Sequence, residues 1–176
     1  MLTLILGGAR SGKSRYAEQC AGDSGKQVVY CATATAGDHE MQARIARHRA
    51  DRPQHWKTVE EPIRLADVLK EQSAGEHCIL VDCLTLWLSN ILFDDQGTVQ
   101  LPFFEQQVSA LIECVDKLPG DLILVSNEVG SGIIPLGEGT RRFVDEAGRL
   151  HQQLAQVCDK VVLVTAGLPQ VLKWTG

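Results

Sequence analysis

The chain alternates between short apolar runs and longer segments whose apolar residues recur every three or four positions. The runs are rich in Val, Ile and Leu, and they cover residues 2–6, 27–31, 78–82, 121–126 and 160–165. Short apolar runs separated by helical patterns predict parallel strands that are buried on both faces. We therefore expect an α/β fold with a mostly parallel sheet and helices on both of its faces.

The segments between the runs predict the helices. Apolar spacing and capping residues indicate helices over residues 15–20, 38–51, 63–72, 84–93 and 102–118, and a long helix capped by Thr140. Residues 54–62 are expected to be extended or a short strand, and residues 166–169 to close the core. The sequence contains no repeat, low-complexity tract or linker, so residues 1–176 are predicted to form one domain.

A phosphate-binding loop is predicted between the first run and the first helix. The segment matches G-x-x-x-x-G-K-[ST] at every fixed position and consists of Gly7, Gly8, Ala9, Arg10, Ser11, Gly12, Lys13 and Ser14. Its glycines allow successive backbone N–H groups to face one anion, and the helix N-terminus adds partial positive charge. Lys13 would reach the β- and γ-phosphates, and the Ser14 hydroxyl would bind Mg²⁺. The flanking strand and helix argue against an accidental Gly-rich turn. The chain is therefore predicted to bind a nucleoside triphosphate on a P-loop NTPase-type (RecA-like) fold.

Polar residues follow two further runs, at the sheet edge where the P-loop is expected. Asp82 ends an apolar run downstream of the loop, which is the Walker B pattern for a carboxylate that organises Mg²⁺. Thr33, Ala34 and Thr35 follow the second run. Because ligands bind at the carboxyl ends of parallel strands, this loop is either part of the nucleotide site or a simple strand-to-helix connection.

A basic cluster lies in the segment that follows. Arg44, Arg47, Arg49 and Arg52 surround His48 within a short stretch. Such a cluster is usually a solvated helix face. The chain carries a formal net charge of −5, which argues against broad nucleic-acid binding and favours a local phosphate-handling role for these arginines. His48 is a candidate nucleophile toward phosphorus, with a structural or merely exposed histidine as the alternative.

Composition narrows the class of protein. No apolar run approaches the ~20 residues of a membrane span. The first run leads directly into the P-loop, so no cleaved signal peptide is expected, and a cytoplasmic location is predicted. The six cysteines are Cys20, Cys31, Cys78, Cys83, Cys114 and Cys158. They form no C-x-x-C pair and mostly lie in apolar runs, which favours buried small hydrophobic residues over a zinc site or disulfides.

The motifs together reduce the number of reactions that the predicted P-loop could serve. The sequence has neither the N-K-x-D motif of a Ras-like GTPase nor the late arginine-rich lid of a nucleoside monophosphate kinase. The segments G-G-A-R-S-G-K-S, A-T-A-T, R-I-A-R-H-R-A-D-R-P-Q-H-W and S-N-E-V-G-S-G-I-I-P, with Val59, Glu60 and a strand ending in Asp82, closely resemble the CobU/CobP family. The members are bifunctional adenosylcobinamide kinases and adenosylcobinamide-phosphate guanylyltransferases of cobalamin biosynthesis. The resemblance covers essentially the whole chain, through V-V-L-V-T-A-G-L-P.

The resemblance implies two successive reactions on one substrate arm. A γ-phosphoryl group from ATP or GTP passes to adenosylcobinamide. A histidine then takes GMP from GTP and passes it to adenosylcobinamide phosphate, which gives adenosylcobinamide-GDP. The guanylylated histidine matches His48. By the same matching, the nucleotide site is lined by Thr33, Ala34, Thr35, Arg49, Ala50, Asp51, Arg52, Glu60 and Asp82. The resemblance also implies a homotrimer with sites shared between subunits, and small-molecule substrates as partners.

Two alternatives remain open from the residues. One is a P-loop small-molecule kinase that lacks the second activity, in which His48 is structural. The other is a RecA-like NTP-binding module that couples hydrolysis to a protein partner. A covalent His–GMP adduct would separate the bifunctional enzyme from both.

Overall fold

The computed structural model describes residues 1–35 and 53–176, and within them it confirms the five predicted strands. The strands of the described residues are β1 (Leu2–Gly7), β2 (Gln27–Ala32), β3 (Lys57–Glu60), β4 (His77–Asp82), β5 (Asp121–Asn127), β6 (Lys160–Thr165) and β7 (Leu168–Trp174). The helices are α1 (Lys13–Asp23), α3 (Leu65–Gln72), α4 (Leu84–Leu92), α5 (Leu101–Val115) and α6 (Glu138–Val157). The helix expected over residues 38–51 lies outside the described residues.

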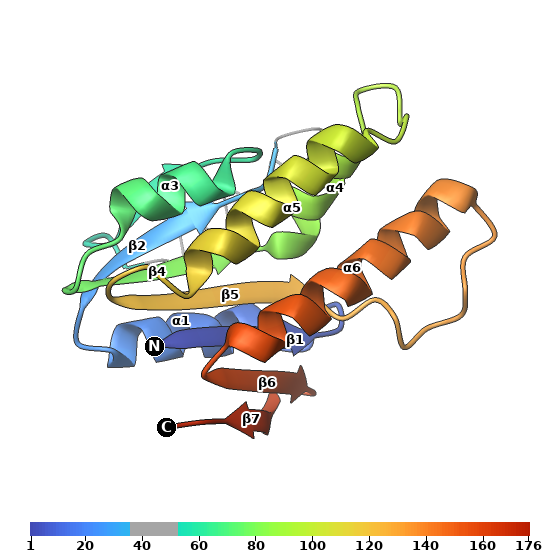
Figure 1. The fold of residues 1–176 in the computed structure, drawn as a ribbon. Coiled ribbons are helices and arrows are strands. Elements are labelled where there is room, and N and C mark those ends of the chain that lie inside the picture. Colours follow the sequence, from blue (N-terminus) through green and yellow to red (C-terminus); the bar gives the residue numbers. More distant parts are fainter. Residues whose placement is uncertain (36–52) are drawn as a thin grey trace.

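The strands form one sheet in the order β3-β2-β4-β5-β1-β6-β7 (Figure 1). Neighbouring strands from β3 to β6 are parallel, and β7 pairs antiparallel with β6. The predicted mostly parallel sheet is therefore confirmed. Because β1 lies between β5 and β6, the P-loop that follows β1 leaves from the interior of the sheet and not from its margin.

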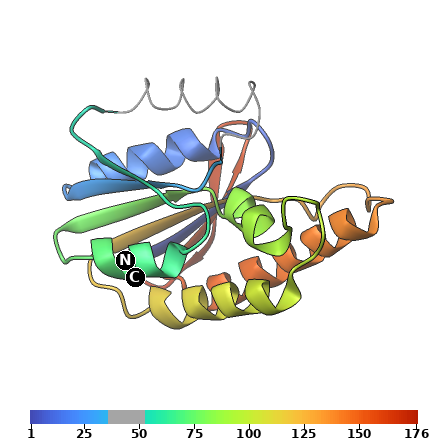
Figure 2. The ribbon, with the colours of Figure 1, turned by 90° about the horizontal axis from the view of Figure 1, so that it is seen from above.

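Helices cover both faces of the sheet, as predicted. α1 lies on one face, while α3, α4, α5 and α6 lie on the other (Figures 1 and 2). Successive strand residues alternate between the two layers. Ile79 and Leu122 pack on the side of the four helices, whereas Leu80 and Ile123 pack on the side of α1. Since both faces of each inner strand are buried, the strands appear in the sequence as continuous apolar runs.

Strand β7 is a difference from the sequence-based expectation, in which residues 166–169 only close the core. Ala166 and Gly167 have φ values of 52° and 79° and form a two-residue turn that sends the chain back along β6. Positive φ at both turn positions suits the twist of a hairpin, but Ala-Gly lacks the Asn-Gly or Asp-Gly signature that predicts it. Pro169 is tolerated in β7 because the strand lies at the sheet margin.

The start of α6 also differs from the prediction. The helix begins at Glu138 with Gly137 at the N-cap position, and Thr140, the predicted cap, lies within the first turn. The N-cap residue makes no side-chain capping bond. Thr140 therefore did not mark the helix boundary, because the helix extends back through Glu138 and through Gly139, a residue of low helix propensity.

The cysteines behave as predicted. All six are free thiols, five of them are buried, and Cys20 is half-buried. Burial raises the pKa of Cys158 to about 12, and the pKa of Cys31 rises to about 12 through burial and the nearby Glu61 carboxylate. These side chains therefore remain neutral thiols that pack in the core.

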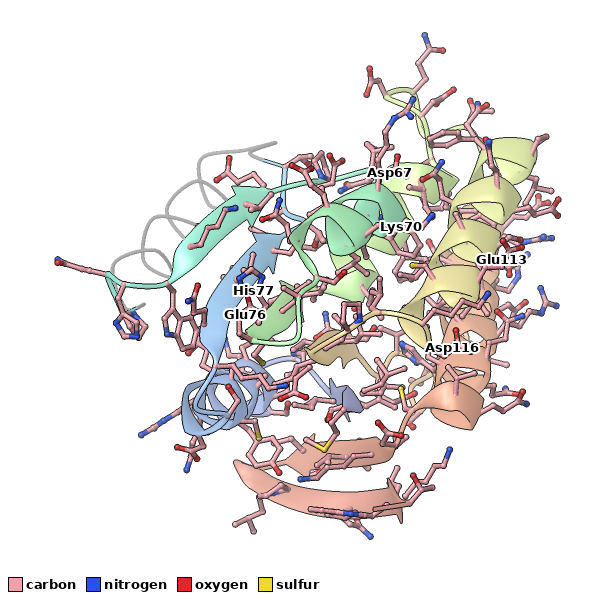
Figure 3. The ribbon with its side chains drawn as sticks, turned by 60° about the vertical axis from the view of Figure 1, so that its left-hand side comes forward. Asp67, Lys70, Glu76, His77, Glu113 and Asp116 are labelled. Carbon is pink, nitrogen blue, oxygen red and sulfur yellow. The ribbon has the colours of Figure 1, made fainter. Side chains whose placement is uncertain are left out.

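The outer surfaces of α3 and α5 are charged. Asp67 and Lys70 on α3, and Glu113 on α5, are exposed on this side of the molecule, with Asp116 just beyond the end of α5 (Figure 3). None of the helices in the described part of the chain is both long enough and apolar enough to cross a membrane.

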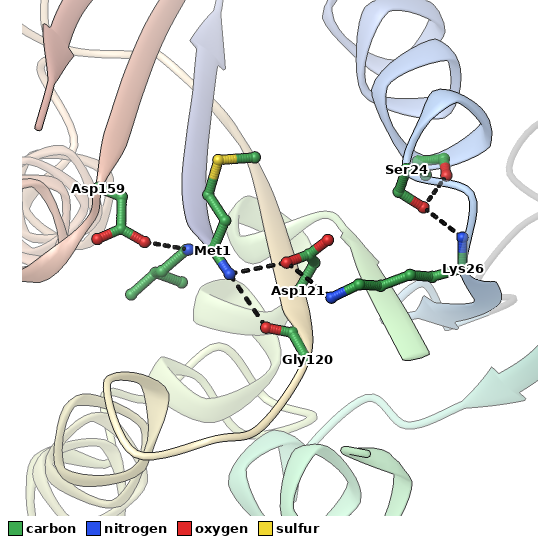
Figure 4. Close-up of polar contacts among 8 residues, drawn as sticks. Met1, Ser24, Lys26, Gly120, Asp121 and Asp159 are labelled. Atoms are coloured by element: carbon green, nitrogen blue, oxygen red, sulfur yellow. Dashed lines mark hydrogen bonds and ion pairs between the residues drawn. The ribbon is translucent and has the colours of Figure 1, made fainter. Parts of the chain in front are cut away.

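The amino end of β1 is fixed to its two neighbours by charged groups (Figure 4). The Met1 ammonium donates to Asp121 Oδ1 at 2.7 Å, and Lys26 Nζ lies 3.1 Å from the same oxygen. On the other side, the Leu2 backbone N–H donates to Asp159 Oδ2 at 2.7 Å. These contacts join β1 to the starts of β5 and β6, and so they set the register of the strand that carries the P-loop.

Candidate nucleotide-binding site

The P-loop joins β1 to α1 through backbone conformations that favour glycine. Gly12, the N-cap residue of α1, has φ of 92°, and Arg10 has φ of 57°. The Ser11 N–H donates to the Gly8 carbonyl at 3.2 Å, which closes a tight turn inside the loop. Left-handed backbone next to a helix N-terminus is the arrangement that directs N–H groups toward a bound anion.

Two glycines of the loop are required by close neighbours. A Cβ at Gly7 would collide with the Ser11 side chain and would lie 2.6 Å from the Val164 carbonyl oxygen of β6. A Cβ at Gly12 would lie 3.1 Å from the Cα of Gly167. The Gly167 N–H also donates to the Ser11 carbonyl at 2.8 Å. The β6–β7 hairpin therefore packs directly against the P-loop and holds its shape.

Lys13 is buried where a phosphate-binding lysine is expected. It is the first residue of α1, only 7% exposed, and its Nζ donates to the Gly8 carbonyl at 3.3 Å. The neighbouring Ser11 hydroxyl is buried and has no hydrogen-bond partner among the described residues. A buried ammonium and an unsatisfied hydroxyl in one loop fit an incoming polyanion, because phosphate oxygens can accept from both and would satisfy the Ser11 hydroxyl, whose burial without a partner is unfavourable.

Asp82 lies at the carboxyl end of β4, opposite Ala32 of β2. The Tyr30 hydroxyl donates to Asp82 Oδ2 at 3.0 Å and so orients the carboxylate. Burial and the adjacent Asp82 raise the pKa of the Cys83 thiol, while the Lys13 ammonium acts to lower it. Because β1 and β4 are parallel strands of one sheet, the P-loop after β1 and Asp82 at the end of β4 lie at the same edge, which brings the Walker A lysine and the candidate Walker B carboxylate to one side of the sheet.

Thr33 has a different environment from the one expected for a residue that lines the nucleotide. It is fully buried, its hydroxyl donates to the Cys83 carbonyl at 2.7 Å, and it accepts from the Cys83 N–H at 2.9 Å. Thr33 thus clamps the end of β2 to the end of β4, directly after Asp82. Thr35 is exposed and Ala34 half-buried beyond it.

Glu60 is exposed at the end of β3, where it pairs with Ala32 of β2. It therefore lies at the same sheet edge as Asp82, two strands away. The predicted residues His48, Arg49, Ala50, Asp51 and Arg52 lie outside the described residues, and their roles stay predictions.

Ser14 and Asp82 supply the hydroxyl and carboxylate oxygens that Mg²⁺ prefers. Ser14 lies in the first turn of α1 and is half-buried, as is Asp82. The described residues contain no group of three or more His, Cys, Asp or Glu side chains that could hold a metal alone. This donor set fits a cation that the protein shares with phosphate oxygens rather than a metal held only by protein.

Three polar residues beside the P-loop were not found by sequence reasoning. Thr85 of α4, Ser126 of β5 and His151 of α6 form a hydrogen-bonded chain. Ser126 follows an apolar run, as Asp82 does, and this was the available signal. Thr85 and His151 lie inside helices, where a single polar residue gives no sign of a long-range partner.

Comparison with known proteins identifies relatives along almost the whole chain. The family CobU, described as cobinamide kinase / cobinamide phosphate guanyltransferase, matches residues 3–172. A Pseudomonas aeruginosa protein named bifunctional adenosylcobalamin biosynthesis protein CobP is 56% identical over 173 residues, covering 98% of each chain. The Escherichia coli (strain K12) protein named bifunctional adenosylcobalamin biosynthesis protein CobU is 41% identical, covering 98% of this chain and all of that one.

Among solved structures, the RadB recombinase has a similar fold. The TM-score is 0.51 at 19% identity, over 92% of this chain and 73% of that chain. At this identity the likeness concerns the fold alone, and it confirms the predicted RecA-like α/β architecture.

Proposed function

The chain belongs to the CobU family of cobinamide kinases / cobinamide phosphate guanyltransferases, and we propose that it catalyses both reactions in cobalamin biosynthesis. The observation that carries the proposal is the family match over residues 3–172, which includes the P-loop and the carboxyl ends of all the parallel strands. The substrates proposed are adenosylcobinamide and ATP or GTP for the first reaction, and adenosylcobinamide phosphate and GTP for the second.

In the kinase reaction, the P-loop holds the triphosphate while the γ-phosphoryl group moves to the corrinoid hydroxyl. The hydroxyl oxygen forms the new bond to phosphorus, the bond to the β-phosphate oxygen breaks, and the hydroxyl proton is released. The buried Lys13 ammonium and the N-terminus of α1 offset the charge of the phosphates. Mg²⁺, held by Ser14 and Asp82 together with the nucleotide, would neutralise phosphate charge.

In the guanylyl transfer, we assign the nucleophile to His48. Its imidazole nitrogen attacks the α-phosphorus of GTP and pyrophosphate leaves. A phosphate oxygen of the corrinoid then attacks the same phosphorus and releases the imidazole. Arg47, Arg49 and Arg52 are proposed to offset charge on the phosphates. With Ala34, Thr35, Ala50, Asp51 and Glu60, they are proposed to line the nucleotide site, while the buried Thr33 holds the end of β2 beside it.

The assembly is proposed to be a homotrimer of one-domain chains in the cytoplasm. Support comes from exposed apolar side chains in the segment that joins β5 to α6, where Ile133 is 98%, Ile134 76% and Leu136 97% exposed. Large apolar side chains gathered on a surface favour contact with another protein chain. One sheet receives strands from both ends of the chain, which supports a single domain. The net charge of −5 supports small-molecule substrates rather than nucleic acid.

The decisive experiment follows the GMP group. We expect incubation with GTP labelled at the α-phosphate to give a covalent adduct that survives denaturation and base but is released by acid, as a phosphoramidate is. His48→Ala should abolish the adduct and the transfer reaction, while phosphorylation of adenosylcobinamide persists at least in part. His55→Ala is the matched control, because His55 is an exposed histidine of the same region. Label found on His55 or Lys13 would contradict the assignment.

A further inference from the structure

A chain of hydrogen bonds links β5, α4 and α6 at the carboxyl end of β5. The Asn127 backbone N–H donates to Thr85 Oγ1 at 2.6 Å. Thr85 Oγ1 lies 3.2 Å from Ser126 Oγ, which in turn lies 2.7 Å from His151 Nε2. Ser126 is only 2% exposed. These hydrogen bonds therefore join three elements through one buried side chain, Ser126, and two half-buried ones, Thr85 and His151.

When the neutral His151 imidazole carries its proton on Nδ1, the protons of this hydrogen-bonded chain have one consistent order. A backbone N–H can only donate, so Thr85 Oγ1 accepts from Asn127 and its own proton is available to Ser126. The Ser126 proton is then available to His151 Nε2, which accepts it. Each hydroxyl thus accepts from one neighbour and donates to the next, and hydrogen bonds arranged in this way reinforce one another.

The Asn127 end of this series of hydrogen bonds is attached to the P-loop. Asn127 pairs with Gly7 in the ladder between β5 and β1. The next residue, Glu128, donates its backbone N–H to the Gly7 carbonyl at 3.0 Å. Gly7 is the first glycine of the P-loop and has no room for a side chain. A shift of the β5 end would therefore move the backbone from which the P-loop begins.

We infer that His151 is a positioning residue for the nucleotide site. In its neutral Nδ1–H form it accepts from Ser126, and through Ser126 and Thr85 it holds the end of β5 against Gly7. In this role it acts through these residues and not by contact with the nucleotide or the corrinoid. The inference rests on the proposed placement of the triphosphate in the P-loop.

Protonation of His151 would reverse the chain, because an imidazolium donates from both nitrogens and cannot accept from Ser126. Burial lowers the pKa of His151, and the Glu128 carboxylate, which faces it from the segment after β5, acts in the opposite direction. Its hydrogen-bond partner from β5, Ser126, and the next member from α4, Thr85, are uncharged. The folded-state pKa of His151 lies below the unfolded value of about 6.5, so the folded protein holds the imidazole neutral at pH 6.5 and above. The neutral arrangement is lost as the pH falls through the folded-state pKa.

The test compares His151→Leu, which removes the acceptor, with His151→Gln, which keeps a neutral acceptor near the position of Nε2. At pH 8, His151→Leu should raise the KM for GTP about three- to tenfold, the factor expected for one net hydrogen bond. The kcat should change less, because no group in contact with the reacting atoms is lost. His151→Gln should restore most of the affinity.

The pH profile and a double mutant add readouts that a purely structural role would not move. Between pH 8 and 5, the KM of the wild-type protein should rise as His151 gains a proton, and His151→Gln should lack that component. Ser126→Ala should match His151→Leu, and the double variant should be no worse than either, because both cut the same chain.

His77→Gln is the matched control. His77 is also half-buried and bonded through its ring, with Nδ1 2.6 Å from the Gln72 carbonyl oxygen, but it lies at the amino end of β4 (Figure 3). It should leave the KM and its pH dependence unchanged. Each KM is measured well below the unfolding midpoint of the variant concerned.

An unchanged KM in His151→Leu, additive effects with Ser126→Ala, or identical pH profiles for the wild type and His151→Gln would overturn the inference. If His151→Leu does not fold, the profile of His151→Gln decides alone. Failure of the site assignment is recognised separately with Lys13→Ala. If that variant binds GTP normally, the triphosphate does not lie in the P-loop. If it loses GTP while His151→Leu does not, only the role of His151 is wrong.

Discussion

At the scale of single residues, Asp82 is the side chain whose charge should matter most for metal-dependent turnover. Asp82→Asn keeps the shape of the side chain and removes its charge. It should therefore strongly reduce Mg²⁺-dependent turnover while leaving the unfolding midpoint almost unchanged. Tyr30→Phe removes only the hydrogen bond that orients the carboxylate and should cost about tenfold in apparent Mg²⁺ affinity, as loss of an orienting partner does. Mg²⁺ titrations of kinase activity measure both.

Asp116→Asn is the control for the lost charge, because Asp116 is exposed at the end of α5 (Figure 3). It should behave like the wild type. Wild-type Mg²⁺ dependence in Asp82→Asn would remove Asp82 from the metal site, whatever Tyr30→Phe does.

The P-loop could be predicted residue by residue because its chemistry is contained in eight consecutive positions. Thr33 shows where such prediction ends. Its sequence context fits a ligand-binding loop, yet its hydroxyl is engaged with the Cys83 backbone, 50 positions away. His151 is a second case, because its hydrogen bond to Ser126 spans two elements. The local sequence around a side chain does not predict which backbone group or hydroxyl, distant in the sequence, will form a hydrogen bond with it.

At the scale of elements, three glycines in the connections between elements distinguish two costs of adding a side chain, namely backbone strain and steric overlap. Gly120, just before β5, has φ of 86°, and a Cβ there would collide with the Ala74 carbonyl and lie 2.5 Å from that of His77. Gly97 has φ of 78° but open space around it, and Gly75 has open space without positive φ. The three positions therefore form a graded series.

We expect Gly75→Ala to change the free energy of unfolding by less than about 0.5 kcal/mol. Gly97→Ala should destabilise by about 1 kcal/mol, through backbone strain alone. Gly120→Ala should destabilise by about 3 kcal/mol or more, because steric overlap with two carbonyls adds to the strain. Urea unfolding measures all three. Equal losses at Gly97 and Gly120 would mean that the neighbouring turn moves aside at little cost.

The parallel strands were predictable as elements because burial on both faces leaves a continuous apolar run. β7 was not, since Val171 is 49% and Leu172 55% exposed, and its hairpin turn uses Ala-Gly. A strand at the margin, formed by an unusual turn, has neither the burial nor the turn signature that makes strands visible in a sequence.

At the scale of the whole molecule, the proposed homotrimer makes a prediction about the segment between β5 and α6. Sedimentation equilibrium should give a particle of three chains. The double substitution Ile133→Asp and Leu136→Asp should shift it toward single chains, because charges replace apolar groups at a contact. Phe103→Asp is the control, since Phe103 is an exposed apolar residue on α5, 38% accessible.

A wild-type protein that sediments as a single chain would contradict the homotrimer itself. A trimer that persists in the double variant would instead place the contact elsewhere on the surface.

The interior position of β1 also has a consequence for how the protein comes into being. β1 is the first strand to leave the ribosome, but its partners β5 and β6 begin at Asp121 and Lys160. The backbone groups that hold the P-loop, from Glu128 and Gly167, are likewise made late. The nucleotide cradle therefore takes form only after Gly167 has been synthesised, through contacts of high sequence separation that form slowly. A chain that stops before Gly167 has the whole P-loop sequence but lacks these contacts, so nucleotide can stabilise the cradle only once they have formed.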